Sequence, residues 1–178
     1  MKPQTIKSGE TIFLFHPEPG DAARLIRYVK AVGDESDFLT FSGKEFNKSE
    51  EEEAAFIANH LSAPNQLILA AELHGEIAGL LTLSASPKPR LRHIGEFGIT
   101  VRKAHWHKGI GSALLRDMIA WARASGIIRK VNLKVLTTNA GAIAAYRKLG
   151  FAIEGTLRRD FCLRGQFMDT YAMGLLID

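Results

Sequence analysis

The residues with the clearest chemical potential in this sequence surround two glycines that follow an expected strand. Residues 99–115 predict a strand, a short loop containing Gly109 and Gly111, and then a helix. The start of a helix leaves about four backbone N–H groups unpaired and has a partial positive charge, so it can bind an anion. Glycines let a diphosphate approach the main chain without meeting a Cβ atom. The turn is therefore a candidate phosphate-binding site, although an ordinary helix start has the same pattern.

Two other nucleotide-binding motifs do not fit this turn. A P-loop has its lysine directly after the last glycine, whereas Lys108 precedes Gly109. A dinucleotide fingerprint requires glycine or alanine at its sixth position, which is Leu114 here. It also requires an acidic residue further on, where Arg129 stands. Neither a P-loop protein nor a dinucleotide-binding protein is predicted.

A second motif follows the next expected strand. Asn139 is a suitable helix N-cap, Gly150 is a suitable C-terminal residue, and Tyr146 lies about two turns after the cap. Taken alone, Tyr146 would be interpreted as a core tyrosine. Together, Val-x(7)-Gly-Ile-Gly-Ser-x-Leu-Leu and Asn-x-x-Ala-x-x-x-Tyr-x-x-x-Gly-Phe resemble the GNAT superfamily of acyl-CoA-dependent N-acetyltransferases. The resemblance is strongest from about Leu67 to Leu157 and extends over nearly the whole chain.

The resemblance implies acetyl-CoA as cosubstrate. The strand at Val131–Leu136 is expected to splay from the strand before the turn, which would admit the pantetheine arm. One departure concerns Trp106, which occupies a position usually held by Arg or Gln; weakened or rearranged phosphate contacts are expected, with Lys108 or Arg102 compensating. The cofactor-binding residues implied are Ile99, Thr100, Val101, Trp106, His107, Lys108, Gly109, Ile110, Gly111, Ser112, Asn139 and Tyr146.

The implied reaction is direct attack of a primary amine on acetyl-CoA in a ternary complex. Such an amine, with a pKa of about 10, is almost wholly protonated at neutral pH and needs a base or a water path. The departing thiolate, with a pKa of about 8.5, benefits from an acid such as tyrosine. Tyr146 holds the position of the family's general acid. Glu96 is the candidate base, with an ordinary glutamate at a sheet edge as the alternative. Cys162 is predicted to be a strand residue rather than a nucleophile.

Acceptor selection is assigned by the resemblance to the irregular segment Gly33–Phe46. Carboxylates beside aromatic side chains favour a cation, so a polyamine, an amino sugar or a protein N-terminus are the acceptors considered. A surface loop with a few buried phenylalanines is the alternative. The candidate acceptor-binding residues are Glu35, Asp37, Phe38 and Phe41.

Alternating strands and helices must position these residues. Their pattern predicts an α/β or α+β chain with a mixed sheet, and residues 1–178 as a single N-acetyltransferase domain. The resemblance implies a mostly antiparallel central sheet with helices on both faces. The expected strands are Thr11–His16, Leu67–Glu72, Glu76–Ser84, Leu91–Val101, Val131–Leu136, Phe151–Leu157 and Phe167–Ile177; the expected helices are Gly20–Val32, one starting after Ser49, Gly109–Ala124 and Asn139–Leu149.

Composition narrows the class of protein further. The chain has 178 residues, 46% of them hydrophobic, and a net charge of +4, which excludes a disordered protein. A single cysteine and no long apolar stretch indicate a soluble, cytoplasmic protein without disulfides or membrane spans. The basic residues lie in small groups, so no nucleic-acid partner is expected despite a pI near 9.3. His105 and His107 are expected to be solvated rather than metal ligands.

Two questions stay open at this stage. A homodimer is compatible with the sequence, although no feature identifies an interface. A non-catalytic acyl-CoA-binding sensor or interaction module is the alternative to an enzyme, because the motifs indicate cofactor binding more directly than turnover.

Overall fold

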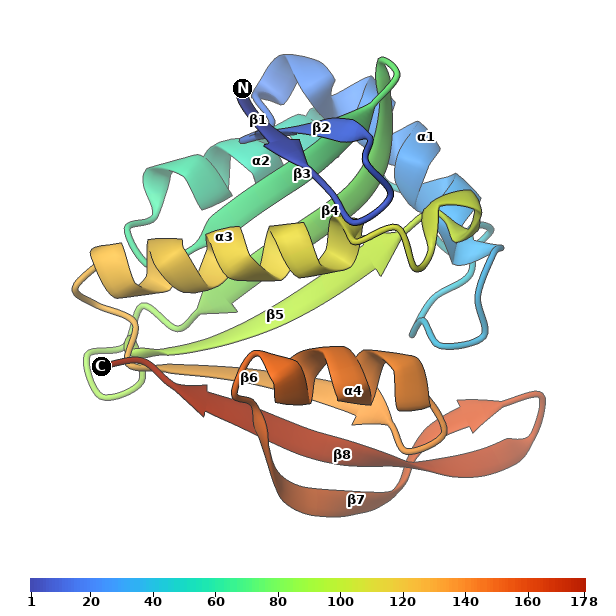
Figure 1. Cartoon of the computed structure of the whole chain (residues 1–178), viewed down its shortest axis with the longest axis vertical. Helices are drawn as coiled ribbons and strands as arrows, with labels where there is room; N and C mark the ends of the chain where they lie inside the picture. Colours follow the sequence, from blue (N-terminus) through green and yellow to red (C-terminus); the bar gives the residue numbers. More distant parts are fainter.

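The computed structural model describes all residues, 1–178, and is built on one eight-stranded sheet in the order β1-β2-β3-β4-β5-β6-β8-β7 (Figure 1). Every neighbouring pair is antiparallel except β5 and β6, which run parallel. The predicted mixed, mostly antiparallel sheet is therefore confirmed. The strands are β1 Lys2–Thr5, β2 Thr11–Phe15, β3 Leu67–Leu73, β4 Glu76–Ala85, β5 Ile94–Val101, β6 Lys130–Leu136, β7 Ala152–Leu163 and β8 Gln166–Leu176.

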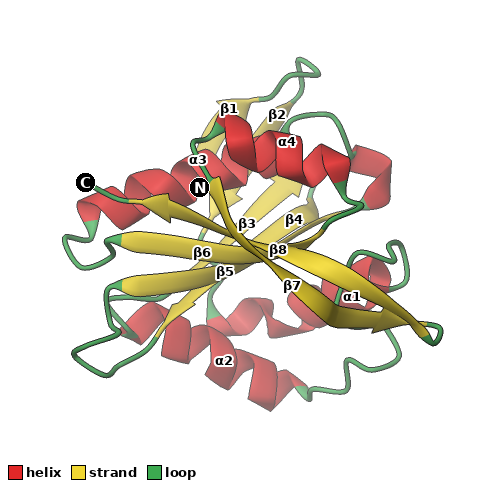
Figure 2. Ribbon diagram, turned by 90° about the horizontal axis from the view of Figure 1, so that it is seen from below, coloured by secondary structure: helices red, strands yellow, loops and turns green.

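Four α-helices cover the two faces of the sheet (Figure 2). Helices α1 (Ala22–Gly33) and α2 (Glu50–Ser62) pack on one face, and α3 (Ile110–Ala124) and α4 (Ala140–Lys148) pack on the other. The core under α3 and α4 contains 28 buried residues, whereas the core under α1 and α2 contains 10. No helix is both long and apolar enough to span a membrane.

Local sequence signals positioned several elements correctly. Ser49 caps α2 through a capping box, because its side chain accepts from the Glu52 N–H and Glu52 accepts from the Ser49 N–H. The predicted hairpin turns at His74 and Gly75, which have φ angles of 53° and 81°. Such a left-handed pair is the conformation that joins two antiparallel strands in a tight turn.

Four expectations need correction. The strand at Thr11 is the second rather than the first, because Lys2–Thr5 pairs with it as β1 despite its polar sequence. The strand expected from Leu91 begins at Ile94, since residues 91–93 form a turn in which the Ile94 N–H donates to the Leu91 carbonyl. The strand expected to end at Leu157 continues to Leu163 through an irregularity before Phe161. The helix expected at Gly20–Val32 begins at Ala22, after a short 3₁₀ turn at Pro19–Asp21, and ends at Gly33.

Gly33 is the last residue of α1, although its φ is not in the left-handed region that favours glycine. A close approach explains the glycine instead. A Cβ atom at Gly33 would lie 2.6 Å from the Gly43 nitrogen, so only glycine lets the following loop return against the helix. The Gly43 N–H donates to the Asp34 carboxylate at 2.9 Å, which fixes this return.

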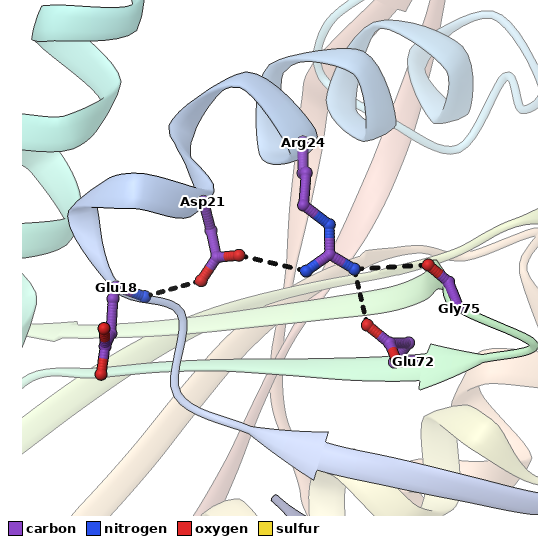
Figure 3. A network of polar contacts seen from close by, with 5 residues as sticks. All are labelled: Glu18, Asp21, Arg24, Glu72 and Gly75. Atoms are coloured by element: carbon purple, nitrogen blue, oxygen red, sulfur yellow. Dashed lines mark hydrogen bonds and ion pairs between the residues drawn. The ribbon is translucent and has the colours of Figure 1, made fainter.

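A polar network fixes α1 to the hairpin of β3 and β4 (Figure 3). Arg24 donates to Asp21 at 3.1 Å and to Glu72 at 2.6 Å, and it contacts the Gly75 carbonyl at 3.4 Å. The pKa of Arg24 is raised, first because of its hydrogen bond to Glu72. Tyr28 lies one helical turn after Arg24 on the same side of α1, so the network also positions Tyr28 against the sheet.

Candidate active site

The sheet opens at one place, between β5 and β6 (Figure 1). The two strands pair only at Ile94 with Lys130, Gly95 with Val131 and Glu96 with Asn132. Beyond this last pair, each strand continues but pairs only with its other neighbour. The expected splaying of the two strands is confirmed, and we call the point after Glu96 and Asn132 the fork.

Backbone groups on β5 face into the fork at alternate residues. The Arg102 N–H donates to the Ala78 carbonyl on the β4 side at 3.0 Å. Because the polar groups of successive residues point to opposite edges of a strand, those of Ile99 and Val101 point toward β6, whereas those of Thr100 point toward β4. Ile99 and Val101 therefore lie where an extended ligand could pair with the chain. The Thr100 hydroxyl is instead bonded to Tyr28 at 3.0 Å.

Trp106 closes one of these backbone positions. Its indole N–H donates to the Val101 carbonyl at 2.7 Å, and the ring is half-buried. The residue that replaces the usual Arg or Gln thus ties the loop back to the last residue of β5. The Val101 carbonyl is consequently occupied, and Ile99 is left as the unobstructed pairing position.

The turn before α3 presents backbone donors. Gly109 is the N-cap residue of α3 with a φ of 103°, a conformation that side chains oppose, and no side chain caps the helix. The first intrahelical bond runs from the Ala113 N–H to the Gly109 carbonyl, which leaves the amides of Ile110, Gly111 and Ser112 without intrahelical partners. This geometry matches the expected anion site.

The side chains expected to compensate for Trp106 are already paired. Lys108 lies 3.2 Å from Glu10, and Arg102 lies 2.8 Å from Glu35. The pKa of Glu10 is lowered, first by its hydrogen bond to Ser8 and then by the one to Lys108. Neither residue brings an unpaired charge to the turn, so its free donors are the backbone amides.

The two loop histidines have different surroundings. His107 is exposed with a φ of 62°. His105 is half-buried, its Nδ1 has no hydrogen-bond partner, and burial followed by the charge of Lys108 lowers its pKa. No cluster of three His, Cys, Asp or Glu side chains is positioned to hold a metal ion.

Helix α4 places Tyr146 beside the fork on the α3 and α4 face. Asn139 caps the helix by accepting from the Ala142 N–H at 3.2 Å. The Tyr146 ring packs against Phe97, the residue after Glu96, with ring centroids 5.9 Å apart, and against Phe151. The side chain is 8% exposed, and burial raises its pKa to about 12. The phenol therefore stays protonated at neutral pH and can act as an acid.

Glu96 lies on the opposite face of β5 from Tyr146. Phe97 points into the core under α3 and α4, so the neighbouring Glu96 points to the face covered by α1 and α2. Glu96 is exposed and takes part in no ion pair, although Lys130 and Lys134 nearby on β6 are paired with Glu154 and Asp160. An uncompensated carboxylate at the fork is available to accept a proton.

The candidate acceptor residues lie in the loop between α1 and α2. Glu35 accepts from the Arg102 guanidinium at 2.8 Å and from the Lys103 N–H at 2.7 Å. Asp37 pairs with Arg164 at 3.0 Å, which brings the tip of the β7–β8 hairpin to this loop. Phe38 is 42% exposed, whereas Phe41 packs against the core under α1 and α2. Both loop acids are already neutralised by arginines.

Sequence reasoning missed several side chains of this region. Ser84 on β4 and Asn132 on β6 are the cross-strand neighbours of Glu96, and buried His60 bonds to Ser84. Their positions follow from strand register, which no local motif encodes. The position of Arg164 beside Asp37 likewise depends on a contact between segments that lie far apart in the sequence.

The forked mixed sheet thus has a turn with free backbone donors on one side and an unpaired carboxylate on the other. Residues 34–151 match the sequence profile of the acetyltransferase (GNAT) family. The chain belongs to this family, which confirms the resemblance and the expectation of an N-acetyltransferase. GNAT enzymes use acetyl-CoA as cosubstrate, as was also expected.

Two curated relatives are similar to parts of the chain. The L-amino acid N-acetyltransferase AaaT of Escherichia coli is 37% identical over 109 residues, covering 59% of this chain and 65% of that protein, just under two thirds of its length. The spermidine N(1)-acetyltransferase of Escherichia coli is 25% identical over 151 residues, covering 83% of this chain and 78% of that protein.

Solved structures share the fold over nearly the whole chain. A GNAT acetyltransferase from Streptococcus pneumoniae has a TM-score of 0.91 and 40% identity, covering 94% of this chain and 99% of the other. The acetyltransferase YncA of Salmonella typhimurium, solved with acetyl-CoA, has a TM-score of 0.81 and 19% identity, covering 94% of both chains. The second likeness concerns the fold alone.

Proposed function

We propose that residues 1–178 act as a single N-acetyltransferase domain that transfers an acetyl group from acetyl-CoA to the primary amine of a small molecule. The observation that carries this proposal is the fork. It brings the protonated phenol of Tyr146 to one face of β5 and the unpaired carboxylate of Glu96 to the other. An acid and a base on opposite sides of one opening suit a reaction with two separate proton transfers.

The chain's own residues fit the cosubstrate. The uncapped amides of Ile110, Gly111 and Ser112 would hold the diphosphate, and the backbone of Ile99 would pair with the pantetheine arm. Acetyl-CoA supplies an acetyl thioester that an amine can attack. Among the other residues implied by the resemblance, Trp106 positions the loop, and Asn139 caps α4.

Each proton has an assigned residue. Glu96 accepts a proton from the ammonium group, so that the nitrogen lone pair becomes free to attack the thioester carbon. Tyr146 donates its proton to the departing sulfur, and the second proton that the nitrogen loses as the amide forms returns to the Tyr146 phenolate through solvent. Burial keeps the phenol protonated at neutral pH, so the proton is present when the thiolate forms.

A free L-amino acid is our leading acceptor. The relative AaaT is named for this activity, and it shares 37% identity with this chain over the matched residues. The loop acids Glu35 and Asp37 are paired with Arg102 and Arg164, so they offer little uncompensated charge to a polyamine. Spermidine, an amino sugar and a protein N-terminus are the other acceptors to be tested.

The test measures thiol release from acetyl-CoA with L-alanine, L-methionine, spermidine, glucosamine and an alanine-initiated peptide. We expect acetyl-CoA to raise the melting temperature and an amino acid to give the fastest amine-dependent release. Glu96→Gln should lower kcat about 10-fold or more with little change in the acetyl-CoA KM. Binding of acetyl-CoA without turnover of any amine would instead identify a non-catalytic sensor.

The kinetic order is tested by varying both substrates. Direct attack in a ternary complex gives intersecting lines in double-reciprocal plots, whereas an acyl-enzyme gives parallel lines. Cys162 is the chain's one cysteine and is exposed on β7. Cys162→Ser should therefore leave kcat within about twofold of the wild type, and a larger loss would point to an acyl-cysteine intermediate.

A further inference from the structure

A row of polar side chains crosses three strands at the fork. Glu96 on β5 is paired in register with Ser84 on β4 and with Asn132 on β6. Side chains in register on adjacent strands lie on the same face with Cβ atoms about 5 Å apart. The row ends on β8 at Gly174, which is in register with Asn132 and has no side chain. Two oxygen-bearing side chains thus flank the carboxylate, one on each neighbouring strand.

Buried His60 fixes the direction of the Ser84 hydroxyl. His60 is 5% exposed, and its Nδ1 lies 3.0 Å from the Phe56 carbonyl, which can only accept. Nδ1 therefore donates this hydrogen bond, and in that tautomer of imidazole the lone pair lies at Nε2. Nε2 lies 3.2 Å from the Ser84 oxygen, so the hydroxyl donates to it. Both lone pairs of Ser84 remain available to a donor on the exposed face.

Asn132 supplies a second acceptor. Its Oδ1 is buried and has no hydrogen-bond partner. A buried acceptor left unpaired is costly, so native proteins rarely keep one without a reason. Lys130 and Lys134, which flank Asn132 on β6, donate to Glu154 and Asp160 instead. The unused oxygen beside Glu96 points to a ligand that brings an N–H group.

We propose that Ser84, Glu96 and Asn132 form a receptor for a primary ammonium group, with His60 as the residue that positions the Ser84 hydroxyl. This inference rests on the proposed function and specifies its acceptor. A primary ammonium has three N–H donors, and the row offers one oxygen to each. When Glu96 takes a proton, an N–H bond breaks, an O–H bond forms, and the electron pair stays on nitrogen. The two remaining N–H groups stay bonded to Ser84 and Asn132, which orients the lone pair.

The test compares KM values for the fastest-reacting of L-alanine, L-methionine, spermidine, glucosamine and the alanine-initiated peptide. Loss of one hydrogen bond to a charged group corresponds to roughly a 10-fold weaker interaction. Ser84→Ala and Asn132→Ala should each raise the amine KM about 10-fold while the acetyl-CoA KM changes by less than about twofold. Ser62→Ala, at an exposed hydroxyl at the end of α2, is the control.

Two substitutions of His60 separate positioning from mere packing. Asparagine can replace Nδ1 and keep the bond to Phe56, but it cannot reach Ser84. Glutamine can replace Nε2 and accept from Ser84. His60→Asn should raise the amine KM about as much as Ser84→Ala does, and His60→Gln should restore most of the affinity. All variants are assayed at a temperature at which circular dichroism shows them to be folded.

A double variant completes the test. Because His60 acts through Ser84, Ser84→Ala with His60→Asn should be no worse in amine KM than Ser84→Ala alone. An unchanged amine KM in Ser84→Ala, or equal effects of asparagine and glutamine at His60, would overturn this inference and leave the acetyltransferase intact. A wild-type protein that acetylates none of the amines would overturn the proposed function itself.

Discussion

The two sides of the fork are built differently. The side facing α3 and α4 combines a contiguous turn, residues 106–112, with a core of 28 buried residues and the buried phenol of Tyr146. The side facing α1 and α2 has a core of 10 buried residues and gathers polar groups, some exposed and some buried, from separate strands and loops. We propose that the first side is a rigid holder for the cosubstrate and that the second is an adaptable surface for the acceptor.

This difference explains where specificity can change within one fold. Backbone amides at the turn before α3 do not depend on side-chain type, so we expect cosubstrate binding to tolerate Trp106 at its unusual position. The acceptor side consists of side chains such as Ser84 and Asp37, each of which can be exchanged without altering the sheet. Substitutions on the two sides should therefore affect different kinetic constants.

The largest expected effect comes from Tyr146→Phe. The ring keeps its packing against Phe97 and Phe151, but the proton donor is lost. We expect kcat to fall about 100-fold or more, with the acetyl-CoA KM within about twofold, because a general acid contributes this much. Initial rates and the melting temperature give both readouts. An unchanged kcat would show that Tyr146 is not the general acid, and the side facing α3 and α4 would then have no proton-transfer role.

The same tyrosine predicts a loss of stability at alkaline pH. Burial raises its pKa from 10.0 to about 12, so above pH 10 the unfolded chain releases this proton before the folded chain does. The contribution is fully present below pH 10 and is lost as pH rises toward 12, by about 3 kcal/mol. Burial also raises the pKa of Tyr28, which acts in the same direction. The free energy of unfolding in denaturant, measured from about pH 9 to pH 12 for the wild type and for Tyr146→Phe, gives the contribution of Tyr146 as the difference between the two pH dependences. If the two curves run parallel, Tyr146 makes no such contribution.

Gly109→Ala tests the holder for the cosubstrate. A side chain at a φ of 103° is strained by about 1–2 kcal/mol, and its Cβ would lie 3.1 Å from the Lys7 nitrogen. We expect the acetyl-CoA KM to rise about 10-fold while the amine KM changes little, because the displaced amides are those proposed to bind the diphosphate. Gly126→Ala is the matched control, since Gly126 also has a positive φ of 64° and open space around it. Similar KM changes in both variants would mean that strain alone is responsible.

The two sides also differ in how well the sequence predicted them. The ends of the two helices on the first side are marked by local sequence signals. Gly109 starts α3, Asn139 caps the start of α4, and Gly150 follows its end. The turn and α4 could therefore be predicted locally. The acceptor side depends on register between strands and on contacts such as Asp37 with Arg164, which join distant segments. Even β1 escaped prediction, because its pairing with β2 rather than its own polar residues makes it a strand.

Trp106→Phe should have a smaller effect on the cosubstrate side. The substitution removes the hydrogen bond to the Val101 carbonyl but keeps an aromatic ring in the half-buried position. A net loss of about 1 kcal/mol would raise the acetyl-CoA KM about fivefold if the loop loses its fixed position. Trp121→Phe on α3 provides the control, because Trp121 makes no hydrogen bond through its indole nitrogen and lies outside the turn. A lower acetyl-CoA KM would show instead that the freed carbonyl binds the ligand.

The smallest effect is expected at the edge of the acceptor side, where Arg164 meets Asp37. Their side chains are 77% and 58% exposed, so solvent screens the pair, and a double-mutant cycle with alanine should give a coupling of about 0.5 kcal/mol or less. Arg24 and Glu72, at 33% and 16% exposure, form the contrasting pair, and their cycle should give a larger coupling because the network of Arg24 is partly desolvated. Thermal unfolding of both sets of variants measures the difference. Equal couplings would show that the Arg164–Asp37 pair fixes the acceptor loop as strongly as Arg24 fixes α1. The proposal that the acceptor side is adaptable would then lose its support from this exposed contact.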